Sequence, residues 1–158
     1  MKKWIIIGAC LLLAVVIGVS IKVYHSAMEP LITAEERAVQ AAEKKVPLKS
    51  VEDFHVYNGQ ETVNVIEGKN NKGEEIIVWV PEKSKKVIVR KAKSGLTKEE
   101  AIQTLNKEKN PQKIISVRLG MEQNIPLWEI YYRSDNNLIN YYYLHFETGE
   151  WLKEIENL

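Results

Sequence analysis

Leu96-Thr97-Lys98-Glu99-Glu100-Ala101-Ile102 echoes a stretch about 64 residues earlier, Leu31-Ile32-Thr33-Ala34-Glu35-Glu36-Arg37-Ala38-Val39. Further along, a shift of 65 residues without gaps lays Val63–Ile66 over Trp128–Tyr131 and Ile77–Val80 over Tyr142–His145. Self-similarity at a fixed spacing indicates a duplicated structural unit. We therefore expect two copies of one small module, and a different strand order in the two copies would refute the duplication.

Each copy is expected to open with an α-helix. The pattern S/T-x-x-E is a capping box, in which a hydroxyl and a carboxylate satisfy exposed amides at a helix start. It occurs twice, as Thr33 with Glu36 and as Thr97 with Glu100. Helices are therefore predicted over about 33–45 and 98–109, and the second should bury Ala101, Ile102 and Leu105.

Four strands should follow each helix, because apolar and polar residues alternate and β-branched and aromatic residues are common there. In the first copy they are predicted near 51–58, 62–69, 74–81 and 85–91. In the second they are predicted near 113–120, 127–133, 138–147 and 150–155. A helix packed across an antiparallel sheet is the natural arrangement, so the fold class is α+β.

Alternation also predicts which residues face the helices. In the second copy the predicted core comprises Trp128, Ile130, Tyr132, Tyr142, Leu144 and Phe146. The 65-residue shift assigns Val63, Val65, Ile77 and Trp79 to the same face of the first copy. Its opposite face would then carry Ile76, Val78 and Val80, which are too apolar for water. The second module or a partner should cover that face, unless the assumed register is wrong by one residue.

The amino-terminal segment predicts a membrane anchor. Trp4 to Ile21 contains no charge and follows Lys2 and Lys3. A helix of this length spans about 27 Å, near the lower limit for crossing a bilayer, and Tyr24 can extend it. The lysines favour a cytoplasmic amino terminus, so the remainder should be extracytoplasmic. The alternative is a signal peptide cleaved after Gly18-Val19-Ser20.

The predicted organisation is therefore a single-pass protein of the cell membrane. It comprises a cytoplasmic amino terminus (1–3), a signal anchor (4–24), a short tether (25–30), a first module (31–92) and a second module (93–158). Cys10 is the one cysteine, and we interpret it as a lipid-facing residue and not as a lipoprotein attachment site. No disulfide framework is possible, so the modules must be held together by their core.

The sequence favours a binding protein over an enzyme. His25, His55 and His145 stand apart, without metal-ligand spacing, and we interpret each as a surface or packing histidine. No nucleophile motif or phosphate loop occurs, so no catalytic residue, cofactor, metal or small-molecule substrate is expected. The net charge of +1 gives no reason to expect nucleic acid. The lysine-rich segment 83–93 is interpreted as a protected strand edge, with wall polymer as a less favoured ligand.

A partner surface is predicted on the second sheet, opposite its helix. Alternation places Glu129 there together with the candidate binding residues Tyr131, Arg133, Tyr141, Tyr143 and His145. Aromatic residues and arginine are the types most enriched where proteins bind each other. Anchoring near the membrane favours a partner that is also membrane-bound, because both are confined to one plane. The alternative is that these aromatics pack against the first module.

The second helix signature and the later run Tyr-Tyr-x-Leu-x-Phe-x-x-Gly-x-Trp, from Tyr142 to Trp151, resemble a PepSY domain. The whole chain is similar to the TseB (YpmB) family of Bacillus-like Firmicutes. This resemblance implies two tandem PepSY/cystatin-like modules in a regulator of cell wall elongation. It also implies association with an elongation-specific class B penicillin-binding transpeptidase. No catalytic residue is carried over. An inhibitor or chaperone-like module for an exported peptidase is the alternative that a PepSY resemblance permits.

The first module departs from the PepSY pattern. It has Pro81 where the second copy has Phe146, and Lys83-Ser84 where the second has Thr148-Gly149. Its resemblance therefore depends mainly on residues 33–39 and on the internal repeat.

Overall fold

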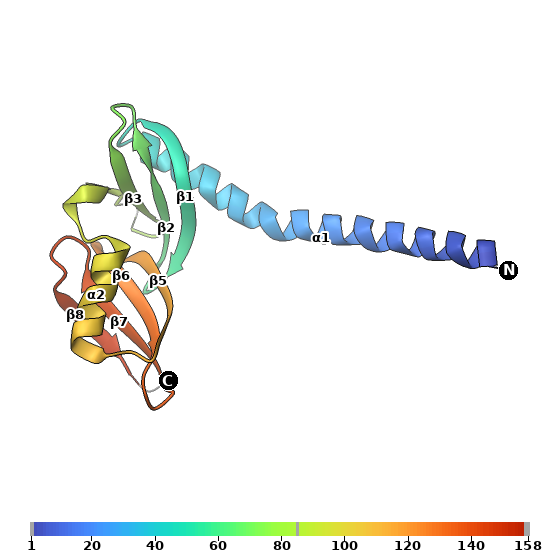
Figure 1. The fold of residues 1–158 in the computed structure, drawn as a ribbon. Helices are drawn as coiled ribbons and strands as arrows, with labels where there is room; N and C mark the ends of the chain where they lie inside the picture. Colours follow the sequence, from blue (N-terminus) through green and yellow to red (C-terminus); the bar gives the residue numbers. More distant parts are fainter. Residues whose placement is uncertain (1, 85, 157–158) are drawn as a thin grey trace. The chain divides into compact units, whose positions relative to one another are not determined.

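The computed structural model describes residues 2–84 and 86–156, with side chains described at residues 3, 7, 8, 12–84 and 86–156. A long helix, α1 (Lys2–Glu43), precedes two antiparallel sheets (Figure 1). The chain divides into two compact units, Met1–Arg37 and Ala38–Leu158, and the second unit contains both sheets. The side chain of Cys10, which the sequence predicted to face lipid, lies outside the described residues.

Each sheet has four strands in chain order. The first comprises β1 (Leu48–Asn58), β2 (Thr62–Asn70), β3 (Glu75–Pro81) and β4 (Ile88–Lys91). A short 3-10 turn, η1 (Ala92–Ser94), and α2 (Lys98–Lys109) lead to the second sheet. That sheet comprises β5 (Lys113–Glu122), β6 (Ile125–Arg133), β7 (Ile139–His145) and β8 (Trp151–Ile155). The strand order is the same in both, so the predicted duplication and the α+β class are confirmed.

Strand pairing corrects the shift between the two copies. Ile66 pairs with Val78 and packs with the end of α1, while Ile130 pairs with Tyr142 and packs with α2. Equivalent positions in the two copies are therefore 64 residues apart, 66 with 130 and 78 with 142. This is also the spacing of the helix echo. The assumed shift of 65 is wrong by one. Because successive side chains of a strand point to opposite faces, this error inverts every predicted face of the first sheet.

The end of α1 covers the face of Ile76, Val78 and Val80, for which the sequence predicted a cover by the second module or a partner unless the register was wrong by one residue. Ala38 and Ala42 are buried there, and their small side chains allow the helix to lie close to the sheet. This core consists of Ala38, Ala42, Ile66, Ile76, Val78 and Val80. The prediction that Val63, Val65, Ile77 and Trp79 face the first helix is therefore wrong.

Those four residues belong to a core that the two modules share. Val63, Val65, Ile77 and Trp79 are buried together with residues of the second module. The ring of Trp79 meets the ring of Phe146 edge to face, with centroids 5.3 Å apart. Trp128 and Leu144 are buried in the same cluster, so the predicted core positions Trp79, Trp128, Leu144 and Phe146 are confirmed. A shared core is expected of modules too small to bury enough surface alone.

Only one of the two predicted capping boxes forms. At α2, the Thr97 hydroxyl accepts from the Glu100 amide, and the Glu100 carboxylate accepts from the Thr97 amide at 2.8 Å. Thr33 lies inside α1, and the predicted tether 25–30 is helical too. The predicted cap at Thr33 is therefore wrong, because the preceding turns of a continuous helix already provide the carbonyl acceptors that a capping side chain would replace. The tether boundary 25–30 stays a prediction. In α2, Ala101 and Leu105 are buried, whereas Ile102 is half-buried.

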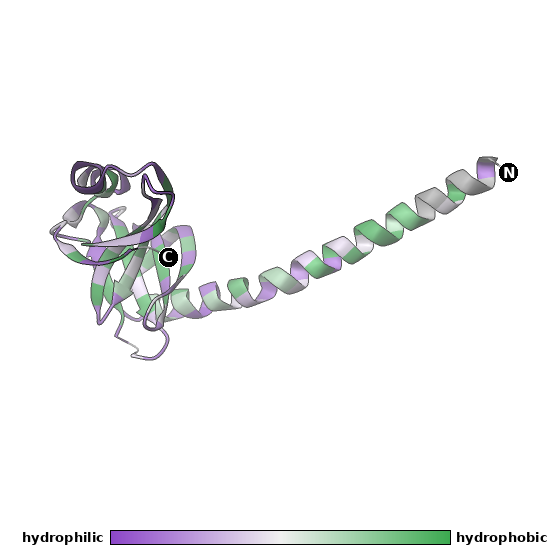
Figure 2. Ribbon diagram, turned by 90° about the horizontal axis from the view of Figure 1, so that it is seen from below, coloured by the Kyte–Doolittle hydropathy of each residue, from purple (hydrophilic) through white to green (hydrophobic). Residues whose placement is uncertain are grey.

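In the part of the chain that the structure describes, one helix is long and apolar enough to cross a membrane. The candidate span lies within Leu12–Glu43 and has a mean hydropathy of 1.4 in its most apolar window. Among the coloured residues of α1 in Figure 2, hydrophobic ones predominate in the amino-terminal half, and hydrophilic ones are interspersed towards the carboxyl end. Length and composition fit an anchor, and they fit a signal sequence equally well. The boundaries 4–24, 31–92 and 93–158 stay predictions.

The turn between β2 and β3 is built around one carboxylate. The Asn70 amide donates to Glu74 at 2.8 Å, and the Lys91 ammonium donates to Glu74 at 2.6 Å. These hydrogen bonds, that of Lys91 first, lower the pKa of Glu74 to about 2. Gly73, at φ +77°, adopts the left-handed conformation that the turn requires.

We expect Glu74→Gln to lower the melting temperature at pH 7 but not at pH 2. The folded-state pKa of Glu74 lies below its ordinary value of 4.5. Ionised Glu74 therefore stabilises the fold above about pH 4.5, and this contribution is lost as the pH falls towards 2. Thermal melting of both proteins across this range measures it. Glu75→Gln, at the exposed neighbouring position, is the matched control. If wild type and Glu74→Gln differ in melting temperature as much at pH 2 as at pH 7, the assignment is contradicted.

Candidate functional site

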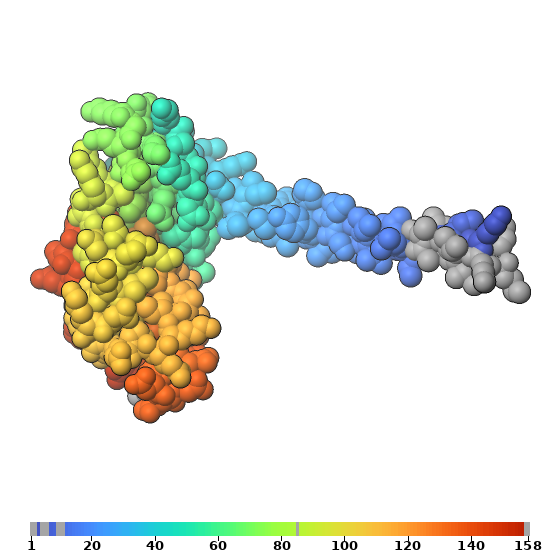
Figure 3. All heavy atoms as spheres, viewed as in Figure 1, coloured from blue at the N-terminus to red at the C-terminus, as the bar shows by residue number. Residues whose placement is uncertain are grey.

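A cleft of about 620 Å³ lies in the second unit, between the two modules. The first sheet contributes Asp53, His55 and Glu67 to its lining, and the second module contributes Leu96, Leu119 and Trp128. The Trp128 indole donates to the Leu96 carbonyl at 2.9 Å, which holds the connecting segment against the second sheet. Strand β1 contacts β5, and in Figure 3 the teal atoms of β1 adjoin the yellow and orange atoms of the second module.

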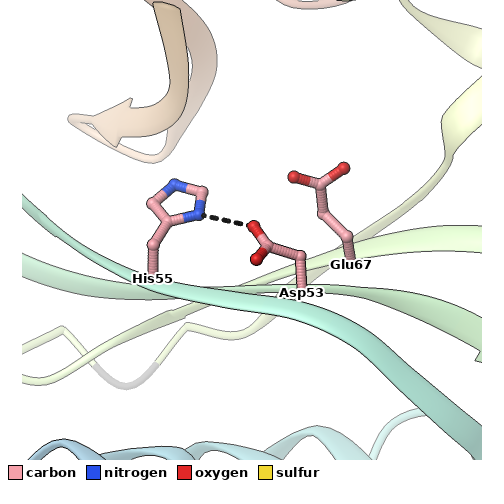
Figure 4. Close-up of side chains that lie close together, drawn as sticks. All are labelled: Asp53, His55 and Glu67. Carbon is pink, nitrogen blue, oxygen red and sulfur yellow. Dashed lines mark ion pairs between the residues drawn. The ribbon is translucent and has the colours of Figure 1, made fainter. Parts of the chain in front are cut away.

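Three ionisable side chains gather at the wall of this cleft. Asp53 and His55 lie two residues apart on β1, and Glu67 on β2 is the cross-strand partner of Asp53. All three side chains therefore share one face of the sheet. Figure 4 shows them on the same side of the two strands. Their potential ligand atoms all lie within 4.8 Å of one another. His55 also reaches the second module, with Nε2 2.9 Å from the Leu119 carbonyl.

Burial and neighbouring charges both act on Glu67 in this group. Burial, followed by the charge of Asp53, raises the pKa of Glu67, while the charges of His55 and Lys98 lower it. Arg118 also lines the cleft, but its guanidinium is paired with Glu129 at 2.7 Å. This group is not apparent in the sequence, because Glu67 joins Asp53 and His55 only through the pairing of β1 with β2. The Asp53-x-His55 alternation was the available signal.

The predicted partner surface is present in part. On the outer face of the second sheet the rings of Tyr131 and Tyr141 stack, with centroids 4.8 Å apart and planes 19° apart. Both tyrosines are half-buried, and Tyr141 pairs with Ile155, which is 40% exposed. Arg133, two residues beyond Tyr131, has a buried Nε without a hydrogen-bond partner among the described residues. Tyr131, Tyr141 and Ile155 therefore form an aromatic and apolar surface on the outer face of the second sheet.

Two other residues of the predicted surface, Tyr143 and His145, are occupied by contacts within the second module. Tyr143 is only 5% exposed, so its prediction as an exposed binding residue is wrong. Lys153, its partner on β8, places an ammonium 4.2 Å from the Tyr143 ring centroid and covers it. His145 stays half-buried, and its Nδ1 accepts from the amides of Glu147 and Thr148 in the following turn. Tyr143 and His145 therefore stabilise the fold of the second module.

The first module covers part of the same face. Tyr57 of β1 is fully buried, and its ring packs on the backbone of Gly120 in β5. A Cβ added at Gly120 would lie 2.5 Å from this ring, so a larger residue would not fit without a shift. The Arg118 guanidinium lies 5.6 Å from the Tyr57 ring centroid, and its partner Glu129 is 3% exposed, although the sequence predicted an exposed position for Glu129. Packing against the first module was the alternative prediction for this face, and it is correct around Gly120 and Arg118, which contact Tyr57. The stacked pair Tyr131 and Tyr141 remains half-open.

Comparison with known proteins agrees with the duplicated α+β architecture. Residues 37–81 match the family described as "Cell wall elongation regulator TseB-like domain", and residues 95–154 match "Peptidase propeptide and YPEB domain", the PepSY domain. A solved structure, the YpmB protein from Bacillus subtilis, has a TM-score of 0.73 and 32% identity, covering 77% of this chain and 95% of that one. The fold is thus that of an apolar amino-terminal helix followed by tandem PepSY-like modules.

A curated relative extends the match to nearly the full length. The "Probable cell wall elongation regulator TseB" of Bacillus subtilis (strain 168) is 32% identical over 151 residues, covering 95% of this chain and 93% of the relative. The chain therefore belongs to the TseB-like family of cell wall elongation regulators. The separate family match of the first module agrees with its departure from the PepSY pattern.

Proposed function

We propose that this protein is a membrane-anchored, extracytoplasmic adaptor that regulates cell wall elongation by binding a class B penicillin-binding transpeptidase. The observation that carries the proposal is the 32% identity to a probable cell wall elongation regulator over 95% of the chain. A match of this extent includes most of the apolar helix as well as both sheets. The role is one of binding and not of catalysis.

The anchor supports a partner within the same membrane. Residues 4–24 cross the bilayer in this proposal, and Lys2 and Lys3 keep the amino terminus in the cytoplasm. Both modules then lie outside the cell, where transpeptidase domains act on the wall. Confinement to one membrane raises the effective concentration of two partners without any new contact.

Tyr131, Arg133 and Tyr141 are the proposed binding surface. Tyrosine and arginine are enriched among the residues that dominate binding energies. The stacked rings present rigid apolar area, and Ile155 extends that area at the exposed strand β8. Arg133 is half-buried, and a guanidinium is a donor that suits a carbonyl or carboxylate of a partner.

One observation favours a second function. The family matched by residues 95–154 is described as a peptidase propeptide domain. A module of this kind could inhibit or assist the folding of an exported peptidase. An inhibitor has to occupy its peptidase directly and does not need a shared membrane, which separates the two functions experimentally.

Capture from intact cells tests the adaptor. The full-length protein, crosslinked in cells, should retain a class B transpeptidase, and so should a variant whose residues 4–24 are replaced by an unrelated membrane helix. A variant exported without any anchor should capture at least about tenfold less, because planar confinement is lost. Failure of the full-length protein to capture a transpeptidase would refute the adaptor. Inhibition of an exported peptidase by the released variant would instead support the second function.

A further inference from the structure

The hydrogen bond from His55 to the second module determines which ring nitrogen carries the proton. The Leu119 carbonyl can only accept, so the contact of 2.9 Å requires Nε2 of His55 to be the donor. In the neutral ring, Nδ1 then carries a lone pair and is an acceptor. This nitrogen points into the group formed with Asp53 and Glu67 (Figure 4).

Two acceptors therefore face each other in the cleft. Nδ1 of His55 lies 3.5 Å from Oδ2 of Asp53, and the Glu67 carboxylate lies beside them. A lone pair directed at a carboxylate is unfavourable unless a positive species lies between them. A metal cation fits this position, since it accepts electron pairs from both sides, and an added proton on the ring is the other species that would fit.

We propose that Asp53, His55 and Glu67 form a divalent transition-metal site in the cleft between the modules, with zinc as its best-fitting ion. One imidazole and two carboxylates are ligand types that zinc binds, whereas calcium and magnesium prefer oxygen ligands alone. Three protein ligands leave a fourth coordination position open to the cleft. This site is independent of the proposed partner surface.

The surroundings of His55 match those of metal-binding histidines. Such histidines usually donate the second ring N–H to a carbonyl or carboxylate, which fixes the tautomer and the orientation of the ring. The Leu119 carbonyl has this role here. Because Leu119 lies on β5 and the three ligands lie on β1 and β2, a bound ion would also strengthen the contact between the modules.

Only a small approach of the three side chains is needed to reach the geometry of a zinc site. Metal–ligand distances in zinc sites are about 2.0–2.2 Å, which places ligand atoms roughly 3.5 Å apart in a tetrahedral arrangement. The three groups already lie within 4.8 Å of one another. The Asp53 side chain is 65% exposed, so it is free to turn towards the ion.

Zinc binding by the full-length protein in detergent tests the proposal. The protein is purified through a tag without histidines, stripped with a chelator, and titrated with ZnCl₂ by calorimetry and thermal melting. One ion per chain and a higher melting temperature are expected, because a ligand that binds only the folded state stabilises it. Asp53→Asn, Glu67→Gln and His55→Gln should each weaken affinity by at least about tenfold. CaCl₂ and MgCl₂ should produce no comparable shift.

The control variants distinguish a site from nonspecific binding. His145→Gln changes a half-buried histidine outside the group and should leave the affinity unchanged. Lys98→Gln removes a positive charge from the lining of the same cleft and should tighten zinc binding, an effect opposite in sign to ligand loss. Asp53→Asn keeps the test valid if His55→Gln does not fold, because Asp53 is exposed. Absence of a zinc-dependent shift in the wild type, or a shift that persists in Asp53→Asn, would overturn the proposal.

Discussion

Phe146→Ala is expected to lower the free energy of unfolding by about 3–5 kcal/mol, as truncation of a buried aromatic generally does. Phe146 is fully buried where the modules meet, against the Trp79 ring and directly over the backbone of Gly95. The cavity would open within the shared core, where neither module can collapse without shifting the other. For a unit of this size the loss corresponds to a fall in melting temperature of roughly 10–20 °C.

Two comparisons make this result interpretable. Phe54→Ala is the same substitution at a half-buried position on β1, and Tyr141→Ala removes a half-buried ring from the outer face. Both should destabilise the protein far less than Phe146→Ala does. Chemical denaturation of the full-length protein in detergent measures all three. An unchanged midpoint for Phe146→Ala would mean that the shared core does not hold the two modules together.

The duplicated fold was predictable because its signals are local. The strand alternation and the capping box at Thr97 can each be recognised within a dozen residues, and the helix echo needs only two such stretches to be compared. Each agrees with the structure. The faces of the first sheet were not predictable in the same way. Side chains alternate with a period of two, so an error of one residue in the shift inverts them all. The helix echo at 64 already contained the correct value.

The other errors have a common physical origin, which is that each depends on residues outside the short stretch that carries the pattern. The Thr33 cap failed because α1 continues through it from the preceding segment. Tyr143 is covered by Lys153 from the next strand. The group formed by Asp53, His55 and Glu67 exists only through the pairing of β1 with β2. Sequence patterns describe one element at a time, whereas these features need two.

Replacing both Tyr131 and Tyr141 with serine is expected to weaken capture of the membrane partner at least about 30-fold. Truncating a residue that dominates an interface costs about 2 kcal/mol or more, and 1.4 kcal/mol is a factor of ten in Kd. The two rings stack on each other, so their contributions are not additive and one change exposes the other. Tyr143, originally part of the predicted set, is left intact because it is buried.

Capture of the transpeptidase by the double variant in cells, with the anchor intact, measures this effect. Trp151→Ser is the matched control, because Trp151 is 57% exposed and lies outside the surface defined by Tyr131, Arg133 and Tyr141. Both variants should melt within a few degrees of the wild type, since none of the three aromatics is fully buried. Selective loss in the double variant would locate the partner on the outer face of the second sheet. Undiminished capture by a folded double variant would move the binding surface away from that face.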